Sequence, residues 1–123
     1  MSPEFLSLED KIAVFAPSGD VALEKAVAMI SDAIIFCREK GITGLLIDAR
    51  ELRGFPHPTV VDRYWFIRKW AEDSQHKVVI SMISRPEMID PEQIGITIAS
   101  NAGLTANVFD NEADARDWLL SSC

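Results

Sequence analysis

His57 and Asp48 are the two residues of this chain whose types and positions would suit acid–base chemistry. His57 stands between two prolines at the predicted start of a helix, and Asp48 follows the short apolar run Leu45–Ile47. The dipole at a helix start disfavours an imidazolium, so this histidine would be neutral and could act as a base with Asp48 as its partner. The sequence places no nucleophile beside them. We therefore expect a protein that is not an enzyme, and catalysis by this pair is the weakest of three interpretations.

Four arginines and a threonine near the same position suit the binding of an anion. Arg50, Arg53 and Arg63 flank the predicted helix start, where free backbone N–H groups also favour negative charge. A phosphate on or beside Thr59 would be stabilised there, although a threonine at this position also serves as an ordinary helix cap. Arg85 follows a buried strand, where it would either bind an anion with two parallel hydrogen bonds or be a plain surface side chain.

The composition limits the classes of protein to which the chain can belong. Its 123 residues fit one domain, residues 1–123, and 48% hydrophobic and 25% charged content is typical of globular proteins. A net charge of −7 argues against binding to nucleic acid or anionic membranes, although residues 50–69 hold five cations and two anions. No apolar run approaches the ~20 residues of a membrane span, so we expect a cytoplasmic location. The cysteines and motifs predict no disulfide, no metal site and no cofactor.

The elements that must position these side chains alternate between strands and helices. Lys11–Pro17 is predicted to be a strand paired with Phe5–Leu8, and the turn Ser18–Asp20 offers a helix N-cap. Apolar residues recur in steps of three and four over Val21–Lys40, which predicts a helix that ends at Gly41.

The remaining elements repeat this alternation. Leu45–Asp48 and Lys77–Ile83 have the continuous apolar character of buried parallel strands. A second helix is predicted to begin at Pro58, the first helical position, with an inward stripe of Val60, Tyr64, Ile67 and Ala71. A third begins at Asp90–Gln93, with Asp90 as the cap and Pro91 at the first helical position, and ends at Gly103. Ala106–Phe109 is a strand, and Asp110 caps a last helix whose inward residues are Ala115, Trp118 and Leu119.

This order predicts a single α/β domain with a mostly parallel central sheet of four to five strands and about four helices. In such a sheet the helix starts gather at one edge, which is where ligands usually bind. We therefore expect residues 18–20, 48–59, 85–90 and Asp110 to be neighbours in space. Tyr64–Phe66 and Trp70 place more aromatic surface on the second helix than one inward stripe needs, so at least one ring should be exposed.

The order of elements resembles the STAS domain, the fold of anti-sigma-factor antagonists, over about Lys11 to Leu120. The resemblance rests on a strand ending in a Gly-Asp turn, a long helix, and three later segments: Asp48–Leu52, Lys77–Ile83 and Asn101–Phe109. Two phrases, Gly54–Pro58 and Met88–Glu92, are similar to a small branch called SpoIIAA-like or STAS/SEC14-like.

The resemblance implies a non-enzymatic regulatory module that binds a protein partner at the start of the second helix. In the antagonists that helix begins with Asp-Ser-Ser-Gly, and a kinase phosphorylates its serine. This chain has Pro56-His57-Pro58-Thr59 there, with His57 or Pro58 at the serine position. The phosphorylation switch therefore does not carry over, and neither does the identity of the partner.

Two binding interpretations follow. In the first, a cytoplasmic regulatory module contacts a protein partner, or a second copy of itself, through His57, Thr59, Arg63 and the neighbouring Arg50, Arg53 and Phe55. In the second, the same edge binds a small anionic or lipid-like ligand, with Asp48, His57 and Arg85 around the mouth.

Overall fold

The computed structural model describes residues 3–90 and 92–123 and contains one central sheet, a small second sheet and four α-helices. The strands are β1 (Leu6–Leu8), β2 (Ala13–Phe15), β3 (Gly19–Asp20), β4 (Gly44–Asp48), β5 (Leu52–Arg53), β6 (Val79–Ile83) and β7 (Ala106–Phe109). The helices are α1 (Leu23–Lys40), α2 (Val60–Ser74), α3 (Ile94–Asn101) and α4 (Glu112–Ser122), with a 3₁₀ turn, η1, at Pro86–Met88.

The central sheet is mixed and mostly parallel, with the strand order β1-β2-β4-β6-β7. β1 pairs antiparallel with β2, which confirms the predicted hairpin. The pairs β2–β4, β4–β6 and β6–β7 are all parallel, as expected for strands joined by helical crossovers. The α/β class and the mostly parallel sheet are therefore confirmed.

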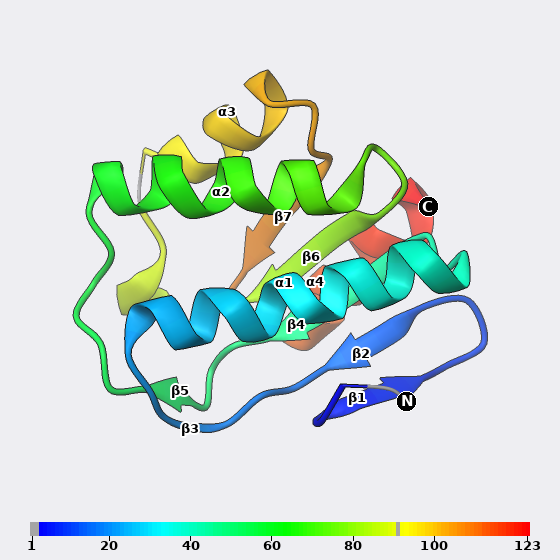
Figure 1. Ribbon diagram of the computed structural model, residues 1–123, viewed down its shortest axis with the longest axis horizontal. Helices are drawn as coiled ribbons and strands as arrows, with labels where there is room; N and C mark the ends of the chain where they lie inside the picture. Colours follow the sequence, from blue (N-terminus) through cyan, green and yellow to red (C-terminus); the bar gives the residue numbers. More distant parts are fainter. Residues whose placement is uncertain (1–2, 91) are drawn as a thin grey trace.

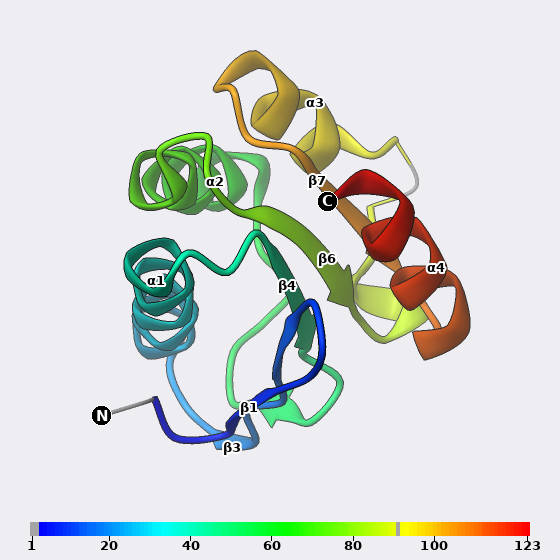
Figure 2. The ribbon, with the colours of Figure 1, turned by 90° about the vertical axis from the view of Figure 1, so that its right-hand side faces the viewer.

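Helices cover both faces of the sheet, but unequally (Figures 1 and 2). α1 and α2 lie side by side on one face with α3 next to α2, while α4 lies alone on the other. The alternation of side chains along β4 divides the core accordingly. Leu45 and Ile47 join the cluster under α1 and α2, and Leu46 joins the cluster under α4 with Ala115 and Leu119.

The helix caps differ in part from the prediction. Gly41 ends α1 in the left-handed conformation as predicted, but the N-cap is Ala22 and makes no side-chain bond. Asp20 is not a cap, because it belongs to β3 and pairs with Arg53 of β5. At α4 the cap is Asn111, whose side chain accepts from the backbone of Asp114, and not Asp110.

The second helix also differs from the prediction. Thr59 is its N-cap, so Pro58 precedes the helix and does not occupy its first position. Val60 and Tyr64, predicted to face inward, are both 54% exposed, whereas Phe66 and Trp70 are buried together with the correctly predicted Ile67. The inward face is displaced because α2 packs against both α1 and α3. The indole N–H of Trp70 donates to the Val27 carbonyl of α1.

The third helix begins later than predicted, at Ile94, with Gln93 as its N-cap in the left-handed conformation. Asp90 accepts hydrogen bonds from the backbone N–H groups of Glu92 and Ile94, which organises the turn ahead of the helix. The prediction that Pro91 occupies the first helical position concerns a residue that lies outside the described ones.

Candidate functional site

A cavity of about 160 Å³ lies at the carboxyl end of β4 and β6, between the sheet and the layer of α1, α2 and α3. Its lining includes residues from two of the four segments predicted to meet at this edge, 48–59 and 85–90, and none from residues 18–20 or from Asp110. The apolar lining residues are Leu23, Ala26, Val27, Ile30, Ala49, Leu52, Phe55, Pro58, Phe66, Ile67, Trp70, Ile80, Met82, Met88, Ile89, Gly95, Ile96, Ala99, Leu104, Ala106 and Val108. Such a wall favours an apolar occupant.

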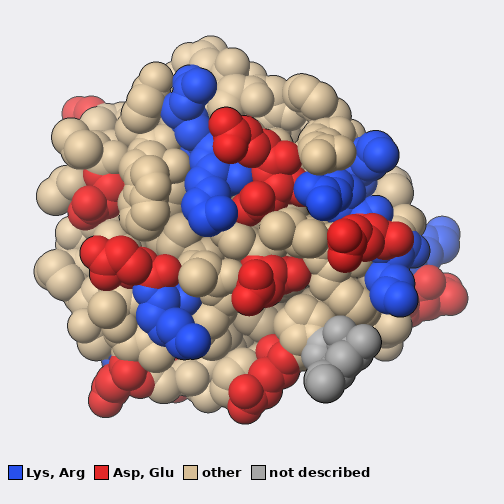
Figure 3. All heavy atoms as spheres, viewed as in Figure 1, with Lys and Arg blue, Asp and Glu red and all other residues tan. Residues whose placement is uncertain are grey.

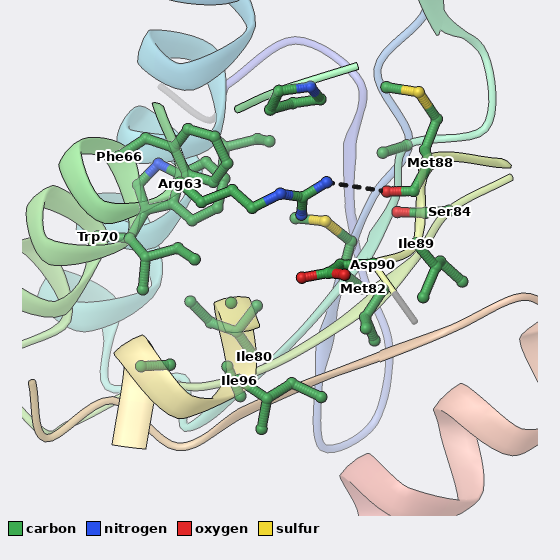
Figure 4. A pocket seen from close by; sticks show the side chains of 18 of the residues that line it. Arg63, Phe66, Trp70, Ile80, Met82, Ser84, Met88, Ile89, Asp90 and Ile96 are labelled. Carbon is green, nitrogen blue, oxygen red and sulfur yellow. Dashed lines mark hydrogen bonds between the residues drawn. The ribbon is translucent and has the colours of Figure 1, made fainter. Parts of the chain in front are cut away.

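The polar residues of the lining are few and include three that ionise, Arg63, Arg85 and Asp90. Arg63 extends from α2 across the cavity, and its guanidinium donates to the carbonyl of Met88 at 3.2 Å (Figure 4). The same nitrogen lies 3.5 Å from Nε2 of His57, which is at the long limit for a hydrogen bond. Ile80 and Ile96 lie below Arg63 in this view.

Arg85 follows β6 and is half-buried beside the same cavity. One of its terminal nitrogens donates weakly to the carbonyl of Leu52 at 3.4 Å. Its Nε is buried and has no hydrogen-bond partner within the described residues. Within those residues, no carboxylate lies within 4.0 Å of the Arg63 or Arg85 guanidinium.

Asp90 is the acidic member of the lining. The hydrogen bond from the Glu92 N–H is the main cause of its lowered pKa, and the bond from Ile94 and the charges of Arg63 and His57 contribute further. Asp90 is therefore ionised at neutral pH. With two guanidinium groups and one carboxylate, the ionisable side chains of the lining carry a net charge of +1.

Of the predicted site residues, the structure brings Phe55, Arg63 and Arg85 to the cavity and leaves the others outside its lining. Asp48 and Arg50 form a bidentate pair with each other, at 2.8 and 2.9 Å, and this hydrogen bonding lowers the pKa of Asp48. Each partner thus neutralises the other.

The other three predicted residues, Arg53, His57 and Thr59, are exposed. Arg53 lies 4.0 Å from Glu51, and Thr59 forms a capping box with Asp62. His57 contacts the Pro58 carbonyl at 3.1 Å and Arg63 at 3.5 Å, so its ring and the Asp48 carboxylate engage different neighbours. The interpretation of Thr59 as a helix cap is thereby confirmed.

The turn after β5 requires a glycine at position 54. Its φ of +101° is a conformation that glycine adopts readily, and a Cβ there would lie 2.6 Å from the backbone nitrogen of Val21. This close approach lets the Val21 N–H donate to the carbonyl of Arg53 at 2.8 Å. The turn therefore fixes the start of the segment that carries Phe55 and Pro58 into the cavity wall.

A second surface feature is an apolar patch on the outward side of α2, formed by Val60, Val61, Tyr64 and Trp65, which are 54%, 78%, 54% and 46% exposed. The prediction that at least one aromatic ring of α2 is exposed is confirmed. Acidic and basic side chains are interspersed on the face of the molecule that Figure 3 shows. Of the cations in residues 50–69, Arg50, Arg53 and Lys69 each lie within 4.0 Å of a carboxylate, which offsets part of the local positive charge.

The described part of the chain holds no group of three or more His, Cys, Asp or Glu side chains that could bind a metal ion. Burial raises the pKa of the Cys37 thiol to about 11, so it stays protonated inside α1. Across residues 3–90 and 92–123, each helix is too short or too polar to cross a bilayer. Comparison of the chain with protein-family models, with curated proteins and with solved structures gave no significant match.

Proposed function

We propose that this protein is a binding module for a small, largely apolar molecule that occupies the cavity beneath α2 and α3. The observation that carries the proposal is the cavity itself, with its continuous apolar wall and few polar groups. Ligand sites in proteins combine these two properties, and in α/β sheets they lie at the carboxyl ends of the strands.

The volume limits the size of the occupant. At about 160 Å³, the cavity is close to an engineered apolar cavity of roughly 150 Å³ that stays dry and binds benzene. A ligand with an apolar body of about six carbon atoms therefore fits without rearrangement of the core.

An NMR titration with hexanamide, a neutral six-carbon probe, tests this function. We expect saturable shifts at the indole N–H of Trp70 and at amides along β6 and β7. Ala106→Leu, which adds three carbon atoms to a space that takes about six, should strongly weaken these shifts. Thr105→Leu is the matched control, because it adds the same side chain at the exposed neighbouring position. Absence of saturable shifts at millimolar hexanamide, or equal shifts in Ala106→Leu, would contradict the proposal.

The exposed patch on α2 favours a second candidate function, a regulatory module that binds a protein partner. Contiguous apolar side chains at a surface mark interaction sites, and aromatic residues are enriched at interfaces. This function is the one that the STAS-like order of elements implies. In this second function, the partner contacts the exposed patch at Val61 and Trp65 and does not enter the cavity.

An affinity pull-down from source-cell lysate tests the second candidate, with wild type beside Val61→Ser/Trp65→Ser. Glu72→Gln, on the same helix, is the control. A protein captured by wild type and Glu72→Gln but not by the double variant would support it. Equal capture by all three would exclude this surface. Sedimentation of the purified chains separates a second copy of the chain from a different partner.

A further inference from the structure

We infer that the ligand of the cavity is a small carboxylic acid, bound as its anion, whose carboxylate is held by Arg85 and Arg63 while its apolar body lies against α2 and α3. The inference rests on the proposed function, because it assigns the chemical class of the molecule that the cavity takes.

Arg85 has hydrogen-bonding capacity that the described residues around it leave unsatisfied. A guanidinium has five N–H donors. Within the described residues, Arg85 makes one side-chain hydrogen bond, the weak one to the Leu52 carbonyl, and its buried Nε has no partner. A buried donor left without a partner is destabilising, and a partly buried charge without a counter-charge adds to that effect. A carboxylate beside Arg85 would supply a counter-charge and accept hydrogen bonds from its guanidinium.

Arg63 supplies the second cation at the same cavity. It donates to a neutral acceptor, the Met88 carbonyl, at 3.2 Å, and the described residues place no carboxylate within salt-bridge distance of it. The carbonyl carries no net charge and offers one acceptor atom, whereas a ligand carboxylate adds charge attraction and can accept two parallel N–H bonds, so it can compete with that carbonyl. The side chain already extends across the cavity (Figure 4).

The charge of the lining selects the charge of the ligand. Arg63 and Arg85 together with the ionised Asp90 give +1, which one carboxylate neutralises. A phosphate monoester would bring a second negative charge close to Asp90, in a protein whose net charge is already −7. A planar carboxylate also matches the planar fork of a guanidinium. These features favour a monoanion over a dianion.

The experiment compares hexanoate with hexanamide, probes of the same length that differ in charge, by NMR titration at neutral pH and low salt. We expect hexanoate to bind wild type at least about tenfold more tightly. Arg85→Gln should remove this preference while hexanamide still binds, which shows that the cavity is intact. Arg68→Gln is the matched control. It removes one positive charge at an exposed residue outside the cavity lining, whose guanidinium contacts Tyr64.

The outcomes separate this inference from the proposed function. Equal binding of hexanoate and hexanamide would overturn the assignment of a carboxylate and leave the apolar cavity as a binding site. Binding of neither probe would overturn both. An equal loss of preference in Arg68→Gln would mean that general charge attraction explains it, and tighter binding of hexyl phosphate would assign the site to a dianion. Either result would overturn the inference.

Discussion

Filling the cavity should stabilise the protein, and Ala106→Leu is the substitution that tests this. Ala106 lies on β7, opposite Ile80 of β6, and its side chain lines the cavity. Leucine adds three carbon atoms to a space of about 160 Å³. At about 0.8 kcal/mol for each buried carbon, less about 0.5–1 kcal/mol of lost rotamer entropy, the expected gain is about 1.5 kcal/mol. For a chain of this length, that corresponds to a rise in Tm of about 5 °C.

Urea and thermal unfolding followed by circular dichroism measure this gain, and the m-value should be unchanged. Ala115→Leu is the matched control, since Ala115 is a fully buried residue of α4 in the other cluster. Overpacking there should destabilise the fold by about 1–3 kcal/mol. If Ala106→Leu destabilised the protein as Ala115→Leu does, the space beside Ala106 would not exist in solution, and the reasoning from the cavity would fail.

Three smaller predictions concern the residues that hold the elements in place. Thr59→Ala removes the capping box of α2 and should lower the free energy of unfolding by about 1 kcal/mol in urea unfolding. Ser81→Ala removes the bond of 2.9 Å from the buried hydroxyl to the Ala115 carbonyl, and should lower it by a similar amount. Asp48→Asn should cost under about 1 kcal/mol at pH 6, because the pair with Arg50 is partly exposed. Since the folded pKa of Asp48 is lowered, its contribution is present above the unfolded value of about 3.9 and is lost as the pH falls through the folded pKa, so wild type and variant should converge in acid.

Each of these has a result that would count against it. Retention of full stability by Thr59→Ala would show that the first turn of α2 needs no cap. A Ser81→Ala variant as stable as wild type would mean that the hydroxyl gains nothing from α4. A difference between Asp48→Asn and wild type that persisted in strong acid could not come from ionisation of Asp48.

The sheet and its crossovers were predictable because burial leaves a strong signal. Runs such as Leu45–Ile47 are apolar throughout because both sides of the strand are covered. A continuous apolar run of this kind predicts a buried parallel strand. The ends of the helices were less predictable. Asp20 and Asp110 are of a residue type that often caps helices. Asp20 instead belongs to β3, and Asn111 caps α4 in place of Asp110. Local preference identifies a cap only to within a residue or two.

The candidate site was predictable in place but not in composition. Arg63 and Arg85 stood out as cations beside the predicted edge, and both line the cavity. Asp48 and Arg50 stood out equally, yet they pair with each other across two residues. The main wall was missed because Phe66, Trp70 and the residues of α3 are ordinary core types. The signal available in the sequence was a set of three small residues, Gly95, Ala99 and Ala106. Their side chains leave space that larger ones would fill.

The contrast between the two faces of the sheet is the strongest physical reason to regard the cavity as functional. Between the sheet and α4, Leu46 and Ile83 of the strands and Ala115 and Leu119 of the helix are essentially fully buried and close the core. On the other face, a space of about 160 Å³ lined mainly by apolar side chains stays unfilled. A larger side chain at Ala106 would fill part of this space and add stability, as predicted above. One face of the sheet is tightly packed, and the other keeps space beside two guanidinium groups that have no carboxylate within 4.0 Å among the described residues. This is the arrangement that the proposed ligand would complete.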